Sequence, residues 1–327
     1  MKKKYWLFTI TAIIMLVLAA CGKDTDSSNE MNKSNAKEET KEEQADTKDS
    51  ETRTITYLGK EYEVAKNVDR IVITGAMEAM EDAVALEVEP VGAITVGGEF
   101  PEIYSSVMKN TESIGEKQQP NFEKILGLKP DIILGSTKFP DEVVQKLEKI
   151  APTILVSHIS SDWEDNLHLM GELAGKTDKA DQVLADYKAN IKNFNHDKLD
   201  GKKVAALRIR GGQIFVYPED IFFNAVLYKE LGLEVPDEVK QAKAQEAISV
   251  EQLAKMNPDY IFMQIQESEK QENNYVFEEM KKDPIVQNIG AFKHDQVFVN
   301  IVDPLLEGGP VYSRMLFLEQ LQEKLKQ

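Results

Sequence analysis

Apolar residues recur every three or four positions over residues 177–199, with charged residues between them. The series consists of Ala180, Leu184, Tyr187, Ile191 and Phe194. This period is that of an amphipathic helix. Thr177 and Asp178 offer an N-terminal cap for it, and a shorter helix is predicted just before, over residues 163–174. A helix of about twenty residues is about 30 Å long, which is enough to join two parts of a protein.

Two similar patterns stand on either side of this helix. Residues 122–136 read FEKILGLKPDIILGS, and residues 250–264 read VEQLAKMNPDYIFMQ. Each has an amphipathic turn, then Pro-Asp, then a short apolar run. Units of this kind can recur by chance in α/β proteins, but the repeat favours two similar α/β lobes joined by one helix.

Strand-like and helical patterns alternate along both halves of the chain. In the first half we predict a hairpin over 54–64, strands at 70–74, 90–96, 131–135 and 153–157, and helices at 78–86 and 142–150. In the second half we predict strands at 203–210, 260–264 and 297–301, and helices at 224–231, 251–255 and 312–325. Such alternation implies parallel sheets. The predicted fold is α/β, with two Rossmann-like lobes connected by a single long helix and a ligand cleft between them.

Length and charge limit the classes of function. A chain of 327 residues exceeds the usual size of one hydrophobic core, so two domains are expected. Lys and Arg number 39 against 56 Asp and Glu, which gives a net charge of -17. An acidic surface argues against nucleic acid or an anionic membrane surface as a partner. The single cysteine excludes an internal disulfide and any multi-thiolate metal site.

That cysteine follows a leader-like segment. A basic start at residues 1–4 precedes an apolar run over residues 5–18, and then come Ala19, Ala20 and Cys21. This is the layout of a signal peptide. It also resembles a bacterial lipobox, in which the cysteine carries lipid such as palmitate and becomes the first residue of the mature protein. The alternative is an uncleaved anchor with an incidental cysteine.

A polar segment follows Cys21. Residues 22–52 contain ten acidic residues and five lysines, with almost nothing to bury, so we expect this segment to stay disordered. The predicted organisation is therefore a signal peptide (1–20), a lipidated tether (21–52), an N-terminal lobe (53–161), a helical segment (162–199) and a C-terminal lobe (200–327).

The ends of the predicted strands locate the candidate site, because ligands of parallel α/β sheets sit beyond the carboxyl ends of the strands. Arg208 and Arg210 end one strand, and alternation places both on one face. The guanidinium fork suits carboxylate and phenolate oxygen atoms. Lys138 lies at the matching strand end of the first lobe, and Tyr217 could add a hydrogen bond or a stacking face. The alternative is an edge strand whose arginines pair with surface acids.

Several motifs, in order, carry a family resemblance. They are the lipobox, the tether, Arg70-Ile-Val-Ile, Pro90-Val91-Gly92, Leu128-Lys-Pro-Asp-Ile-Ile, Lys149-Ile-Ala-Pro-Thr153 and the Arg-x-Arg strand. Together they resemble the iron–siderophore-binding lipoproteins of ABC importers in Gram-positive bacteria. The resemblance covers essentially all of the mature chain. It implies a monomeric receptor that is anchored through Cys21 to the outer face of the cell membrane and has no catalytic activity.

The resemblance also implies a ligand, partners and site residues. A ferric siderophore would bind in the cleft, with iron(III) held by the siderophore, and would pass to the permease subunits without any resident cofactor or protein metal site. Expected ligand contacts are Arg208, Arg210, Lys138, Tyr217 and Phe100. One surface glutamate per lobe would dock on the permease: Glu81, with Glu78 as its rival, and Glu230.

The charged residues of the sequence indicate the type of siderophore less directly. Ferric tris-catecholates are strongly anionic and need several cations, whereas citrate–hydroxamate types would be satisfied by the arginine pair and one lysine. Glu99 and Glu102, beside Phe100, would penalise a highly anionic ligand if they faced inward. These points favour a citrate–hydroxamate or hydroxamate siderophore, with a catecholate as the other possibility.

Two rival functions stay open. One is a receptor of the same fold for haem, cobalamin or a bare metal ion, although only His158 among the four histidines lies at a predicted strand end and none has ligand spacing from another. The other is a lipid-anchored α/β hydrolase. The chain has no Gly-x-Ser-x-Gly elbow and no phosphate-binding loop, and only Asp303 and Glu307 suggest an acid pair.

Overall fold

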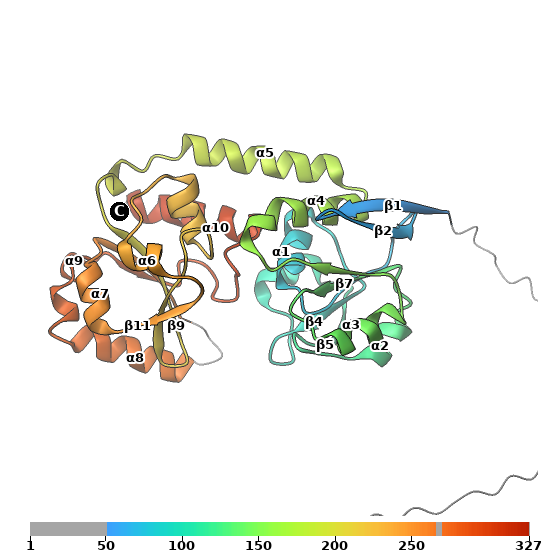
Figure 1. Cartoon of the computed structure of the whole chain (residues 1–327), viewed down its shortest axis with the longest axis horizontal. Helices are drawn as coiled ribbons and strands as arrows, with labels where there is room; N and C mark the ends of the chain where they lie inside the picture. Colours follow the sequence, from blue (N-terminus) through green and yellow to red (C-terminus); the bar gives the residue numbers. More distant parts are fainter. Residues whose placement is uncertain (1–50, 266–269, 327) are drawn as a thin grey trace, which may run out of the picture. The chain divides into compact units, whose positions relative to one another are not determined.

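Two sheets, one before and one after helix α5 (Thr177–Asn193), organise the protein (Figure 1). The computed structural model describes residues 51–265 and 270–326. The predicted signal peptide, Cys21 and all but the last two residues of the tether lie outside the described residues. The predicted architecture of two α/β lobes joined by one helix is confirmed.

The N-terminal lobe contains a six-stranded sheet in the order β6-β5-β4-β3-β7-β8. Its strands are β3 (Ile71–Ile73), β4 (Gly92–Thr95), β5 (Glu112–Glu116), β6 (Gln119–Pro120), β7 (Ile132–Ser136) and β8 (Thr153–Val156). All pair in parallel except β6, which pairs antiparallel to β5 at the edge. Strand β5 was not predicted, because only Ile114 of its five residues is fully buried and the apolar signal is weak.

A hairpin of β1 (Thr52–Tyr57) and β2 (Lys60–Ala65) precedes this sheet. The helices of the lobe are α1 (Met77–Leu86), η1 (Glu102–Val107), α2 (Phe122–Gly127), α3 (Asp141–Glu148), η2 (Ser160–Asp162) and α4 (Trp163–Leu173). Helix α1 is unusual because it buries three carboxylate side chains, those of Glu78, Glu81 and Asp82. A buried acidic group is unfavourable unless it forms hydrogen bonds or ion pairs. Some of these partners come from the other lobe.

The C-terminal lobe contains a five-stranded sheet in the order β11-β10-β9-β12-β13. Strands β9 (Val204–Arg210), β12 (Tyr260–Ile265) and β13 (Val297–Val299) pair in parallel, whereas β10 (Gln213–Val216) pairs antiparallel with both β9 and β11 (Glu246–Ile248). The expectation of a wholly parallel sheet is therefore wrong for this lobe. Gly211 and Gly212 both have positive φ, which permits the two-residue turn that sends the chain straight back as β10.

The helices of the second half are η3 (Asp197–Leu199), η4 (Ala225–Glu230), α6 (Asp237–Gln241), α7 (Val250–Met256), α8 (Lys270–Lys282), η6 (Val286–Asn288), α9 (Gly290–Lys293) and α10 (Val311–Lys326). Helix α5 ends six residues earlier than predicted, because Phe194 adopts an extended backbone and is buried. Thr177 begins α5 but does not cap it: the N-cap residue is Lys176, which makes no side-chain capping bond.

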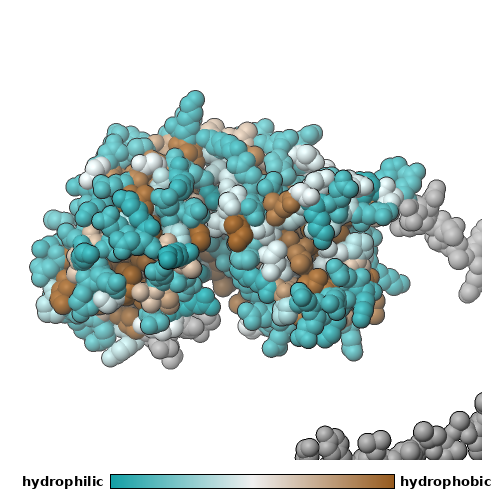
Figure 2. All heavy atoms as spheres, in the orientation of Figure 1, coloured by the Kyte–Doolittle hydropathy of each residue, from teal (hydrophilic) through white to brown (hydrophobic). Residues whose placement is uncertain are grey.

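The C-terminal helix α10 connects the two lobes a second time. It packs against α1, α4 and α5, and the ring of its Phe317 stacks on Phe223 at 4.4 Å. One hydrophobic core accordingly contains residues from both lobes, while a second is confined to the C-terminal lobe. The face shown in Figure 2 is mainly hydrophilic, with an open notch between the lobes on the side away from α5. No helix in the described ranges is long and apolar enough to cross a membrane.

Candidate ligand-binding cleft

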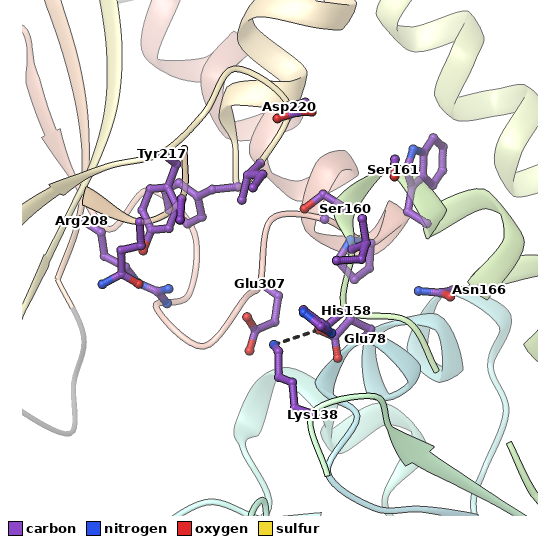
Figure 3. A pocket seen from close by; sticks show the side chains of 18 of the residues that line it. Glu78, Lys138, His158, Ser160, Ser161, Asn166, Arg208, Tyr217, Asp220 and Glu307 are labelled. Atoms are coloured by element: carbon purple, nitrogen blue, oxygen red, sulfur yellow. Dashed lines mark ion pairs between the residues drawn. The ribbon is translucent and has the colours of Figure 1, made fainter. Parts of the chain in front are cut away.

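A cavity of about 390 Å³ lies between the lobes (Figure 3). Its walls come from both sheets: Lys138 follows β7, His158 follows β8, and Arg208 and Arg210 end β9. The loop before α10 contributes Glu307. The cavity therefore lies at the carboxyl ends of the parallel strands, as the strand pattern predicts.

Four of the five predicted ligand contacts line this cavity together: Lys138, Arg208, Arg210 and Tyr217. Phe100 is not among the lining residues; its half-buried ring packs against the core instead. The neighbouring Glu99 and Glu102 are exposed and also lie outside the cavity lining. The bridge between Val96 and Glu99 folds this segment into a tight loop of its own, so the predicted role of Phe100 is not supported.

The two arginines sit on an interior strand, because β9 lies between β10 and β12. The alternative of an edge strand is wrong. A nitrogen of the Arg208 guanidinium donates to the backbone oxygen of Pro304 at 3.1 Å, and the guanidinium lies 5.4 Å from the ring of Phe222. The guanidinium is thus held in place, whereas Arg210 is exposed. The buried hydroxyl of Tyr217 has no hydrogen-bond partner among the described residues, so it is available for a ligand.

Two carboxylates lie among these cations. The Lys138 ammonium is 3.6 Å from Oε1 of Glu78, and the Lys117 ammonium is 2.7 Å from Oε1 of Glu307. Figure 3 shows Glu307 between Arg208 and Lys138 in that view. The sequence pattern does not identify Lys117 as a site residue because it does not predict strand β5. Lys117 stands directly after β5, where the rule that ligands bind at strand ends would have identified it.

The pKa values of the two carboxylates are shifted in opposite directions. Burial and the negative charge of Glu307 raise the pKa of Glu78, against the opposing effect of Lys138. Burial would also raise the pKa of Glu307, but the positive charges of Lys117, Lys138 and Arg208 outweigh it and lower that pKa. Glu307 therefore keeps its negative charge at neutral pH, because its three cationic neighbours favour the charged form.

The histidine of the cleft adds no positive charge. Burial and the nearby Lys138 lower the pKa of His158, and its Nδ1 lies 2.7 Å from the hydroxyl of Thr137. A search of the described ranges finds no group of three or more His, Cys, Asp or Glu side chains that could hold a metal ion.

The predicted docking role of Glu81 is wrong, because its carboxylate is fully buried. It accepts hydrogen bonds from the backbone N–H of Glu307 at 2.9 Å and of Ser313 at 3.1 Å, and from the Ser313 hydroxyl. A carboxyl group from one lobe thus binds a free N–H group in the first turn of α10 and another in the loop before it. Glu78, its rival, is also buried and faces the cleft.

Glu230, the other glutamate predicted to dock on the permease, is not the freely exposed residue that this role requires. Its side chain is only 20% exposed, and its two oxygen atoms contact the guanidinium of Arg314 and the hydroxyl of Tyr187. These contacts link η4, α10 and α5. Both carboxylate oxygen atoms of Glu230 therefore have partners within the protein.

Because Glu81 is buried, stability should depend on pH. Burial raises its pKa from an ordinary value of 4.5 to about 8. Between these values the folded protein holds a proton that the unfolded chain has lost, so the free energy of unfolding should fall as the pH rises. Urea denaturation at several pH values should show a smaller fall for Glu81→Gln than for the wild type. Equal pH slopes would contradict this assignment.

Comparison with known proteins shows the family. A model of the periplasmic binding protein family matches residues 72–300. The chain belongs to that family. Members are substrate-binding proteins, so this periplasmic binding protein is not an enzyme, and what occupies its cleft is a ligand and not a cofactor.

Several similar proteins take part in iron uptake or bind siderophores. The chain is 43% identical over 328 residues to the iron-uptake system-binding protein of Bacillus subtilis, covering 99% of both chains. The structure of the triscatecholate siderophore-binding protein FeuA of Bacillus subtilis, complexed with ferri-bacillibactin, superimposes with a TM-score of 0.78 at 46% identity, covering 84% of this chain and 98% of that one. Staphylococcus aureus SirA with staphyloferrin B gives a TM-score of 0.70 at 25% identity, covering 84% and 99%.

Proposed function

We propose that this periplasmic binding protein captures a ferric siderophore of the tris-catecholate type outside the membrane and delivers it to the permease of an ABC importer. The observation that carries the proposal is the gathering of four cations at one cleft: Lys138, Arg208 and Arg210 line it, and Lys117 pairs with the lining residue Glu307. On a protein with a net charge of -17, this local group of cations makes the cleft the place where an anionic ligand would be attracted.

This ligand differs from the citrate–hydroxamate type that the sequence alone favours. That preference counts only one lysine beside the arginine pair and places Glu99 and Glu102 toward the ligand. Lys117 adds a cation, and neither glutamate lines the cavity. The binding of ferri-bacillibactin by FeuA, at 46% identity, supports a catecholate.

A citrate–hydroxamate siderophore is the second candidate. The observation in its favour is the pair Glu78 and Glu307, whose carboxylates offset part of the positive charge in the cleft. A less anionic ligand would suit that reduced charge better.

Ligand titration separates the candidates. Trp163 lines the cavity, so its fluorescence should report occupancy. The panel contains a ferric tris-catecholate, a citrate–hydroxamate, a trihydroxamate, ferric citrate, haem and cobalamin, with calorimetry as a second readout. We expect the tris-catecholate to bind at the lowest concentration. Tighter binding of the citrate–hydroxamate would favour the second candidate, and a response to haem or cobalamin alone would reject both.

We also propose that the protein is a monomer attached to the outer face of the cell membrane by lipid on Cys21. The support is the leader pattern of residues 1–21 and the polar tether after it, which lie outside the described residues. Cys21→Ser should move the protein from the membrane fraction into the culture medium. Retention of the variant in the membrane would reject lipid attachment at this residue.

A further inference from the structure

Glu307 is placed where an acidic group of the ligand would be expected. Its Oε1 is 2.7 Å from the ammonium of Lys117, and its side chain is only 25% exposed. Lys138 and Arg208 also act on its charge. Charges that are partly shielded from water interact more strongly than exposed ones. In the ligand-free protein, Glu307 therefore neutralises the same cations that an anionic ligand would use.

The backbone around Glu307 is held, so its side chain is the part that can move. The N–H of Glu307 donates to Oε1 of Glu81 at 2.9 Å, and the N–H of Gly308 donates to the Ser313 hydroxyl at 3.1 Å. Gly308 has a φ of +76°, and a Cβ there would lie 3.0 Å from the backbone of Phe222. This tight turn requires glycine. The carboxylate can thus leave Lys117 by side-chain rotation without any change in the loop.

We propose that Glu307 is an internal counter-ion that a strongly anionic ligand must displace from Lys117, Lys138 and Arg208, and that it thereby limits the affinity for such ligands. The inference rests on the proposed function. A ligand with several acidic oxygen atoms forms more contacts with these cations than one carboxylate loses. A neutral ligand has no charge with which to displace the carboxylate, so the ion pair stays in place and Glu307 affects its affinity little.

The test is Glu307→Gln in the purified protein, which keeps the shape and the backbone contacts but removes the charge. We expect its affinity for a ferric tris-catecholate to rise about tenfold, because a like charge next to the anionic ligand is gone. Affinity for a neutral ferric trihydroxamate should change much less. Glu102→Gln is the matched control: it also removes one negative charge, but from an exposed residue outside the cavity, and should leave both affinities unchanged.

A second set of variants ties the effect to Lys117. In a Lys117→Met background, Glu307→Gln should have a smaller effect, because the ion pair is already absent. Glu307→Asp withdraws the carboxylate from Lys117 but keeps the negative charge. We expect it to raise the affinity for the tris-catecholate by a smaller factor than Glu307→Gln. If Glu307→Gln does not fold, Glu307→Asp provides the test.

The two proposals fail in different ways. Unchanged or weaker tris-catecholate binding by Glu307→Gln, with normal binding by the wild type, would overturn the role of Glu307. Weaker binding would in addition mean that the carboxylate positions Lys117 for the ligand. Absence of tris-catecholate binding by the wild type would overturn the proposed function itself.

Discussion

Replacing both Arg208 and Arg210 with alanine should weaken the binding of a ferric tris-catecholate at least about a hundredfold. Charge-assisted hydrogen bonds contribute about 1.5–3 kcal/mol each, so the loss of two should cost about 3 kcal/mol or more. Most of the effect should come from Arg208, because its guanidinium is held by Pro304 and Phe222 before any ligand arrives. The exposed Arg210 must lose more side-chain freedom on binding.

Calorimetry with the single and double variants measures these contributions. The matched control is the pair Lys281→Ala and Lys282→Ala, which removes two positive charges from the exposed surface of α8. A similar loss of affinity in that control would mean that net charge, and not the cleft, governs binding. Full affinity in the arginine double variant would refute the site.

Replacing Glu230 with alanine should lower the free energy of unfolding by about 3–5 kcal/mol, because it leaves a buried cation without its partner. The Arg314 side chain is only 3% exposed, and its guanidinium contacts Glu230, the backbone oxygen of Gly309 and the ring of Trp163 at 4.6 Å. Without the Glu230 carboxylate, the other two groups in contact with the Arg314 guanidinium, the Gly309 oxygen and the Trp163 ring, are neutral.

Urea denaturation at neutral pH measures this loss. Glu164→Ala is the control, because Glu164 forms a more exposed ion pair with Lys188 at 2.9 Å, and such pairs contribute less than about 1 kcal/mol. The result also distinguishes the structural role of Glu230 from docking on a permease. Wild-type stability of Glu230→Ala combined with lost iron uptake would restore the docking role and contradict the buried network.

The two errors about the docking glutamates share one cause. Glu81 and Glu230 carry charges at helical positions, where exposure is the usual expectation. Each is buried because its partners come from distant segments: Ser313 lies 232 residues from Glu81, and Arg314 lies 84 residues from Glu230. A local pattern contains no information about such partners. The omission of Lys117 has a local cause instead: the weak apolar pattern of β5 hides the strand end after which Lys117 stands.

What the sequence determined by itself is the pair of α/β lobes, the joining helix and the group of Lys138, Arg208, Arg210 and Tyr217 at the strand ends. These features depend on periodicity and on the direction of parallel strands, which are properties of neighbouring residues. Only the tertiary structure decided which acids are buried, that β10 turns back beside β9, and that Glu307 meets Lys117 in the cleft. These depend on which distant groups compensate each charge when the two lobes pack together.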